Sequence, residues 1–151
     1  MKSVSAFLLC DRIFVHPNCL TTAGLHIAAP DYLSLPLDAD PEAVGQAVSA
    51  ALERSSAIVP HPGSWTGLAK PRLQAAGSKS EAAFVRGARL VEVSMDNAAL
   101  RLVATHNGGS KGDGKGFSPL QPTAMTLPIN ATRTAIGVAF AGMIACCTGV
   151  D

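Results

Sequence analysis

The chain contains a weak copy of one of its own segments. The stretch "LPLDADPEAVGQAV", residues 35–48, aligns without gaps to "LPINATRTAIGVAF", residues 127–140. Both copies begin with Leu-Pro and an aliphatic residue, continue with Asp or Asn and Ala, and later contain Ala-[Val/Ile]-Gly-x-Ala. A gapless match of this kind is unlikely to arise by chance and indicates a repeated structural unit. We therefore expect two similar units, each the end of a strand that leads into a capped helix.

The capping residues and the apolar spacing both support a helix in each copy. Asp40 can cap the first helix, with Pro41 at its first position, and Thr132 takes the cap position in the second. Apolar residues at helical spacing give each helix one face to bury: Val44, Val48, Ala51 and Leu52 in the first, and Ile136, Phe140, Met143 and Ile144 in the second. Gly45 and Gly137 interrupt the helices at matching positions, where glycine costs about 1 kcal/mol relative to alanine. We interpret both as points where a helix backbone packs closely against another element.

The segment between the two copies begins with a connection rich in proline and glycine. This connection, Val59–Pro71, predicts an irregular surface loop. Ser78 or Ser80 can then cap a short helix that has Glu81 in its first turn. Gly87 is suited to end this helix.

A β-hairpin is expected after the short helix. Its strands are Leu90–Met95 and Ala99–Thr105, joined at Asp96–Asn97. Further strands, Leu33–Leu37 and Thr123–Ile129, precede the two repeated helices. This order of elements favours an α+β fold, an antiparallel or mixed β-sheet with helices packed on it and two pseudo-repeated strand–helix units.

The start of the chain has some features of an export signal, but we interpret it as a buried strand. Lys2 precedes an apolar run of only residues 6–10, Leu9 is too bulky for a cleavage site, and Asp11 and Arg12 follow directly. The apolar run 135–147 is shorter than the ~20 residues of a membrane-spanning helix. We therefore expect a cytoplasmic protein that does not bind a membrane.

The composition favours one domain and argues against a nucleic-acid-binding protein. With 151 residues, 48% of them hydrophobic, the chain is expected to form a single domain, residues 1–151. Its net charge of +1 is too small for a broad nucleic-acid-binding surface. Residues 1–60 carry six acidic and three basic side chains, whereas residues 61–120 carry four and eight.

The stretch "THNGGSKGDGKGFSP", residues 105–119, has the look of a phosphate-binding loop. Its core, Gly109–Gly116, has G-x-x-x-x-G-K spacing, but Gly116 stands where a hydroxyl must ligate magnesium. Such a loop must also open a helix, which Pro119 and Pro122 oppose. We interpret it as a flexible connection between strands. The alternative is a small enzyme that binds a nucleotide or phosphorylated substrate at this loop.

The remaining motifs do not mark a catalytic or metal centre. "GSWTG", residues 63–67, has Trp65 where a nucleophile elbow needs serine, and the four histidines are isolated in the sequence. "HPNC", residues 16–19, together with Cys146 and Cys147 could supply ligands, but neighbours on a helix point about 100° apart. We expect no catalytic residue, no cofactor and no metal.

The cysteines and the single tryptophan have structural interpretations. Without an export signal, Cys10, Cys19, Cys146 and Cys147 are expected to be buried thiols. Trp65 has two interpretations that the sequence leaves open. It is either a lid packed over the core or an aromatic anchor at a protein interface.

Residues 35–147 resemble a known family. The pattern is carried by Gly45 with Ala51-Leu52 and Ser55, by Ser80 with Phe84, Gly87 and Ala88, and by Gly116-Phe117. It is similar to that of the immunity proteins of bacterial contact-dependent growth inhibition (CDI) systems. The resemblance implies a cytoplasmic protein without enzymatic activity, whose partner is a cognate toxin C-terminal domain, often a nuclease.

Immunity of this kind depends on covering the toxin's active site or a nearby surface with complementary charge. We expect Asp31, Asp38 and Glu53 to oppose a basic cleft, and Trp65 to contact the partner as well. Because the whole chain is slightly positive, either only one face is acidic or the toxin is not a nuclease. A structural subunit that oligomerises through the charge-poor helices is a third hypothesis, and the sequence does not define the oligomeric state.

Overall fold

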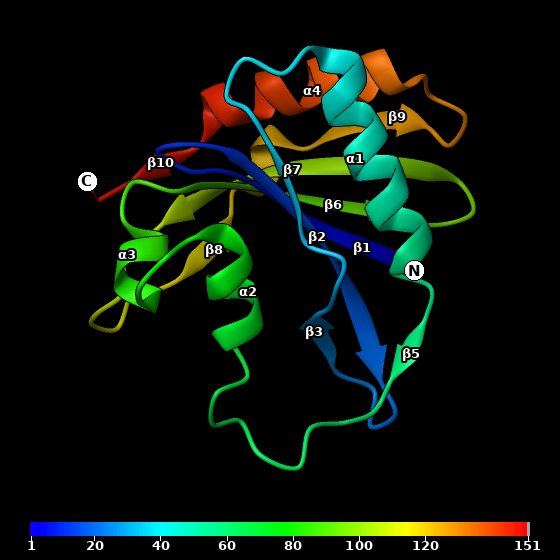
Figure 1. Ribbon diagram of the computed structural model, residues 1–151. Coiled ribbons are helices and arrows are strands. Elements are labelled where there is room, and N and C mark those ends of the chain that lie inside the picture. The colour runs from blue at the N-terminus through cyan, green and yellow to red at the C-terminus, as the bar shows by residue number, and fades with distance from the viewer. Residues whose placement is uncertain (151) are drawn as a thin grey trace.

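A computed structural model describes residues 1–150 as one sheet with helices on both faces (Figure 1). The helices are α1 (Pro41–Arg54), α2 (Lys70–Ala76), α3 (Glu81–Val85), the 3-10 helix η1 (Gln121–Thr123) and α4 (Arg133–Cys146). The strands are β1 (Lys2–Leu8), β2 (Ile13–Thr21), β3 (His26–Ala28), β4 (Leu33–Leu35), β5 (Ile58–Val59), β6 (Arg89–Met95), β7 (Ala99–Asn107), β8 (Phe117–Pro119), β9 (Met125–Pro128) and β10 (Thr148–Gly149).

The sheet is mixed and curled. Strands β10-β7-β6-β1-β2-β3 lie side by side in this order, while β8 and β9 also pair with β7, and β4 and β5 with β2. All pairs are antiparallel except β5 with β2 and β10 with β7. The α+β class with a mixed sheet and packed helices is therefore confirmed, as are the two strand–helix units β4–α1 and β9–α4.

Helices α1 and α4 cover one face of the sheet, and both begin at the predicted caps. The side chain of Asp40 accepts from Ala43 N at 2.8 Å, and that of Thr132 accepts from Ala135 N at 3.1 Å. The apolar positions predicted from helical spacing are all buried here: Val44, Val48, Ala51, Leu52, Ile136, Phe140, Met143 and Ile144. They form one core with the inward-facing residues of β1, β2, β6 and β7.

The two helical glycines lie where α1 and α4 cross. A Cβ on Gly45 would overlap the carbonyl oxygen of Arg133, the first residue of α4. A Cβ on Gly137 would overlap the carbonyl oxygen of Pro41, the first residue of α1. The start of each helix therefore packs directly against the glycine of the other helix, and the predicted close backbone packing is confirmed.

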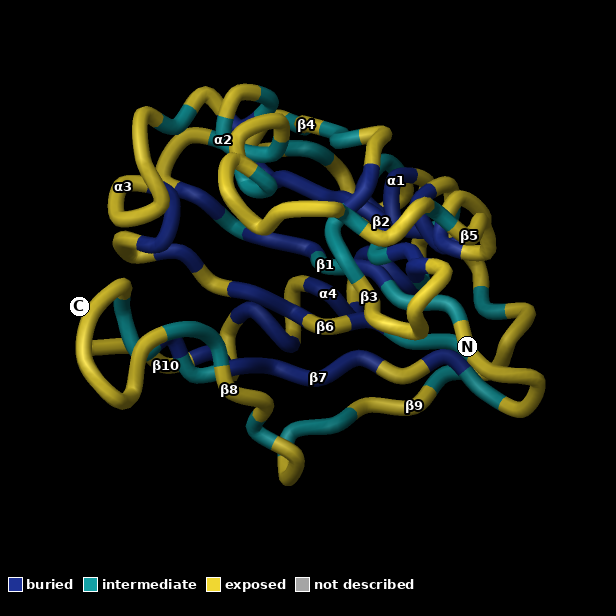
Figure 2. Tube along the Cα trace, turned by 90° about the horizontal axis from the view of Figure 1, so that it is seen from below, coloured by how far each residue is buried: buried dark blue, intermediate teal, exposed yellow. Residues whose placement is uncertain are grey.

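Helices α2 and α3 cover one end of the opposite face of the sheet. Phe7 of β1 packs edge-on against Phe84 of α3, with ring centroids 5.0 Å apart, within a second apolar cluster. Farther along this face the side chains become polar, and Asn18 Nδ2 donates to the hydroxyls of Ser3 and Ser5. Figure 2, seen from below, shows the buried strands of the sheet bordered by exposed loops.

Most local predictions for the middle of the chain are confirmed. Ser80 caps α3 by accepting from Ala83 N at 3.1 Å. Asp96 shapes the hairpin turn between β6 and β7, because its carboxylate accepts from the backbone N–H groups of Ala98 and Ala99. The first residues form a strand, β1, as expected.

Some elements differ from the prediction. The loop expected over Val59–Pro71 starts in β5 and ends in α2, whose N-cap Ala69 offers no side-chain hydrogen bond. Strand β2 was not predicted, and Pro17 lies in the middle of it, although proline has no N–H for the ladder. Its carbonyl oxygen still accepts from Ala29 N at 3.0 Å.

The expectation that the cysteines are buried thiols is wrong for two of them. Cys19 and Cys147 are buried, but Cys10 and Cys146 are exposed, and all four thiols are free. Cys10 lies in the turn between β1 and β2, and Cys146 ends α4 next to buried Cys147.

Within residues 1–150, none of the helices combines the length and apolar character required to cross a membrane.

Candidate partner-binding surface

Trp65 lies on the surface of the loop between β5 and α2. The residue is 54% exposed, so it is not a lid packed over the core. The indole ring makes an edge-to-face contact with the His61 ring, with centroids 5.6 Å apart. The lid interpretation is therefore wrong, and contact of Trp65 with a partner stays a prediction.

The loop that carries Trp65 is pinned to the turn between β2 and β3. His61 Nδ1 lies 3.0 Å from the hydroxyl of Thr21, and His61 N donates to the hydroxyl of Thr22 at 3.2 Å. Thr21 is buried, and its oxygen also accepts from Ala23 N and Leu25 N, which leaves its O–H to donate to His61. Because His61 is held in this way, the exposed indole rests on a fixed neighbour, which reduces the ordering cost of binding.

A hollow of about 450 Å³ lies between Trp65 and α2. Leu68 and Leu73 supply apolar lining, while Lys70 and Lys79 contribute amines at the surface. A second hollow of about 340 Å³ lies on the other side, between Trp65 and β3, and includes Ile27, Leu68 and Arg72. The indole therefore stands between two depressions that both contain apolar surface.

Arg72 is held in place by its neighbours on α3. Its Nη2 lies 2.6 and 2.7 Å from the two carboxylate oxygens of Glu81, and its guanidinium stacks 4.5 Å from the centroid of the Phe84 ring. The side chain is only 17% exposed. Arg72 thus joins α2 to α3, and its charge is balanced within the fold.

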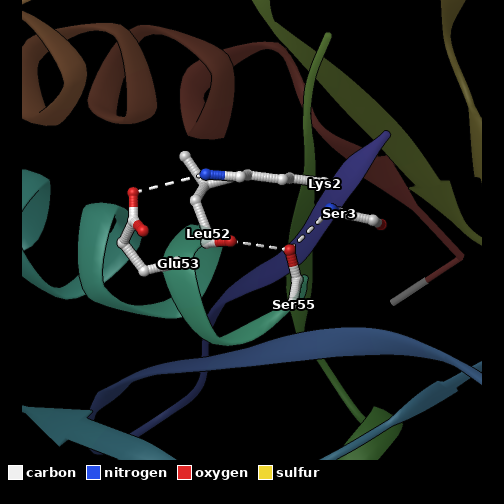
Figure 3. Close-up of polar contacts among 5 residues, drawn as sticks. All are labelled: Lys2, Ser3, Leu52, Glu53 and Ser55. Carbon is white, nitrogen blue, oxygen red and sulfur yellow. Dashed lines mark hydrogen bonds and ion pairs between the residues drawn. The ribbon is translucent and has the colours of Figure 1, made fainter. Parts of the chain in front are cut away.

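Two of the three acidic residues predicted to contact a partner are ion-paired. Asp31 Oδ2 lies 2.7 Å from Nη2 of Arg54. Glu53 Oε1 lies 3.3 Å from Nζ of Lys2 (Figure 3). Beside the second pair, the Ser55 hydroxyl donates to Leu52 O and accepts from Ser3 N. These contacts attach the end of α1 to β1, but the carboxylates of Asp31 and Glu53 remain more than half exposed.

Asp38 lies at the opposite end of α1 from the other two carboxylates. It precedes the helix, whereas Glu53 is in its last turn and Asp31 pairs with Arg54, also in that turn. A helix of 14 residues is about 20 Å long. The three carboxylates are therefore not one cluster, and among residues 1–150 no hydrogen bond or ion pair holds the exposed side chain of Asp38.

The glycine-rich loop is closed by its own backbone. Gly108 N donates to Gly116 O and Gly116 N donates to Gly109 O, both at 2.8 Å. The loop leads from β7 into β8, so it joins strands as predicted and does not open a helix. At its base, the buried Asn107 side chain donates to the carbonyls of Val85 and Ala88.

One titratable side chain, His16 of β2, is buried beneath the surface. His16 is 2% exposed, and its Nδ1 lies 3.1 Å from Pro17 O, while Nε2 has no hydrogen-bond partner within the described residues. Burial lowers the pKa of His16 to about 4, with a smaller contribution in the same direction from Arg72. His16 is therefore neutral at physiological pH.

Within residues 1–150, no group of three His, Cys, Asp or Glu side chains is placed to hold a metal ion.

Known structures of similar shape were found, although no family model and no curated protein sequence matches the chain. One is a chain of the CdiA-CT/CdiI toxin and immunity complex from Yersinia pseudotuberculosis, with a TM-score of 0.75, 14% identity and 97% coverage of both chains. The present chain shares this fold. Another is a protein of unknown function from Neisseria meningitidis, with a TM-score of 0.71, 16% identity, and coverage of 97% of this chain and 94% of that one.

Proposed function

We propose that this chain is an immunity protein that binds and neutralises the C-terminal toxin domain of a CDI system. The observation that carries the proposal is the match to a chain of a toxin and immunity complex over 97% of both chains. The resemblance in sequence pattern from residue 35 to 147 points to the same class independently of the fold. We propose that the chain acts in the cytoplasm and catalyses no reaction.

The proposed mechanism is steric and electrostatic. The chain covers the toxin's active site or a surface beside it, and protection then depends on affinity and on rejection of other toxins. A nuclease is the toxin class that we propose, because its basic cleft offers a surface that carboxylates can oppose. Interfaces of this kind are centred on a few buried aromatic or arginine anchors within a polar rim.

The four residues proposed to contact the toxin differ in how readily they can do so. Trp65 is exposed and is held by His61, so it suits the role of an aromatic anchor. Asp38 is exposed and unpaired within residues 1–150, so its charge is free to meet a cation. Asp31 and Glu53 are already paired with Arg54 and Lys2, so a toxin must share or replace those cations. These pairs are exposed, and such pairs contribute about 0–1 kcal/mol, so they can be exchanged.

A growth experiment tests the proposal. The candidate toxin is the C-terminal domain encoded beside this gene, expressed from an inducible promoter with or without the present chain. We expect arrested growth without the chain and normal growth with it. An unrelated CDI immunity protein, expressed at the same level, is the control for specificity. Arrest that persists despite abundant folded chain would contradict the proposal.

A further inference from the structure

The chain around Trp65 is basic, in contrast to the acidic contact surface expected from the sequence. Residues 60–80 contain two lysines and one arginine, and no Asp or Glu. Arg72 is balanced by Glu81, at 2.6 Å. Lys70 and Lys79 are exposed, and neither belongs to an ion pair within residues 1–150.

Both lysines line the same depression. We call the hollow of about 450 Å³ formed by Trp65, Leu68, Lys70, Leu73 and Lys79 the Trp65 hollow. Lys70 is the first residue of α2 and Lys79 follows the end of that helix, so the two amines come from opposite ends of α2. No carboxylate is among the residues that line the hollow in the described part of the chain.

The carboxylates near the hollow are already occupied. Glu81 is bound by Arg72, and Asp11, which lines a smaller depression together with Lys79, lies 3.1 Å from Arg12. The pKa of Asp11 is lowered, mainly by its hydrogen bond to Arg12, so it stays ionised in that pair. Within residues 1–150, the positive charge of the hollow is therefore not compensated by an ion pair.

We propose that the Trp65 hollow docks an acidic segment of the toxin domain that also carries an apolar side chain. The apolar side chain packs against Trp65, Leu68 and Leu73, and carboxylates on either side of it meet Lys70 and Lys79. This inference rests on the proposed function for the identity of the partner. The charge and the apolar lining alone define the chemistry of the segment, which is acidic and amphipathic.

An acidic docking segment has a consequence for how the toxin is blocked. A cleft that binds nucleic acid is basic, because it must neutralise phosphates. The segment that enters the Trp65 hollow therefore belongs to a surface outside such a cleft. The Trp65 contact then serves as an anchor beside the toxin's active site and not as a substrate mimic.

The single tryptophan of the chain makes binding beside it directly observable, because all indole emission comes from Trp65, which lines the hollow and also the depression next to β3. The probe is a synthetic peptide of glutamate and leucine, titrated into the full chain at low ionic strength. A lysine and leucine peptide of equal length and a single-stranded oligonucleotide serve as comparison ligands. We expect a saturable blue shift with the acidic peptide that weakens at high salt, because exposed charges are screened.

Charge-reversal variants assign the effect to the two lysines. The double variant Lys70→Glu, Lys79→Glu should bind the acidic peptide at least about tenfold more weakly, because two attractive contacts become repulsive. The matched control, Lys111→Glu with Lys115→Glu, reverses two exposed lysines of the glycine-rich loop and should bind like the unmodified chain. The inference is overturned by equal binding of the basic peptide, by a larger shift with the oligonucleotide, by no shift at all, or by no effect of the double variant.

The same variants separate this inference from the proposed function. If the toxin domain binds the unmodified chain and the Lys70→Glu, Lys79→Glu variant equally well, the toxin docks elsewhere and only the inference fails. If the toxin domain does not bind the unmodified chain, the proposed function fails, while the peptide titration still decides whether the hollow accepts an acidic segment. If the double variant binds the toxin domain more weakly and the control variant binds it normally, both the proposed function and the docking of an acidic segment are supported.

Discussion

Gly45 of α1 lies directly against the carbonyl oxygen of Arg133, at the point where α4 begins. Gly137 of α4 has the equivalent relationship with Pro41 at the start of α1. The sequence repeat is thus also a packing repeat. The glycine of each copy packs against the helix start of the other copy. Glycine, which weakens a helix by itself, is required here by the second helix.

Replacing either glycine by alanine should destabilise the fold. The added methyl group would overlap backbone atoms, which cannot rotate away, so α1 and α4 must separate. We expect Gly45→Ala and Gly137→Ala each to lower the free energy of unfolding by about 1–3 kcal/mol or more, measured by urea denaturation. Gly142→Ala is the matched control on α4, where an added Cβ meets nothing within 4 Å. It should raise stability by up to about 1 kcal/mol, and equal losses at all three positions would disprove the packing explanation.

His16 should make the stability of the protein depend on pH between about 6.5 and about 4. The pKa of His16 is lowered in the folded state. In this pH range the histidine is therefore protonated in the unfolded chain and neutral in the folded chain. The free energy of unfolding therefore falls as the pH falls, by about 3 kcal/mol in total at 1.36 kcal/mol per pKa unit. Below about pH 4 this contribution is fully lost, and above about pH 6.5 it is fully present.

A substitution isolates the contribution of this histidine. In His16→Leu, urea unfolding across the same pH range should lose that part of the pH dependence, although carboxylates still titrate near its lower end. His26 is exposed, and His26→Gln should leave the pH profile unchanged. A His16→Leu profile parallel to that of the original chain would show that His16 is not buried in its neutral form.

Asn107 should be important for stability at the base of the glycine-rich loop. Its Nδ2 donates to Val85 O at 2.7 Å and Ala88 O at 2.8 Å, and its Oδ1 accepts from Gly109 N at 2.9 Å. Asn107→Ala removes the hydrogen-bond partner of these three backbone groups, and each buried group left unpaired costs about 1–3 kcal/mol of stability. We therefore expect the free energy of unfolding to fall by at least about 2 kcal/mol. Asn97→Ala, at an exposed position in the hairpin turn, should change stability by less than about 0.5 kcal/mol.

A nucleotide should not stabilise the chain. Because the glycine-rich loop runs into β8, it does not itself open a helix whose N-terminus could bind phosphate. We expect the same Tm with and without a millimolar nucleoside triphosphate and magnesium, measured by differential scanning fluorimetry. A saturable rise in Tm would instead support the enzyme alternative, because a ligand that binds only the folded state must stabilise it.

Local sequence signals predicted the parts of the fold that depend on neighbouring residues. Asp40, Thr132 and Ser80 cap helices because the cap bond spans three residues, and Asp96 shapes its turn in the same way. Helix α2 was missed because it is short and begins at Ala69 without a side-chain cap. Strand β2 was missed because it contains a proline.

The candidate surface was only partly predictable, because its electrostatics depend on contacts between distant residues. Lys2 and Glu53 are 51 positions apart, and Thr21 and His61 are 40 apart. Nothing in the sequence shows that Lys2 balances Glu53 or that Arg54 balances Asp31. The segment charge of residues 1–60 therefore suggested a free acidic face, whereas the fold distributes those carboxylates between the two ends of α1. The sequence drew attention to Trp65, whereas the hollow that Lys70 and Lys79 share with it follows only from the fold.

The central claim is that this chain inhibits a toxin by binding it. The most direct measurement is a titration of the purified toxin domain, encoded beside this gene, with the purified chain, recording both toxin activity and heat of binding. We predict that activity falls to zero at one chain per toxin domain, with a Kd of about 10 nM or lower, as in other tight inhibitor complexes. Full toxin activity and no heat of binding at micromolar concentrations of correctly folded chain would contradict the account.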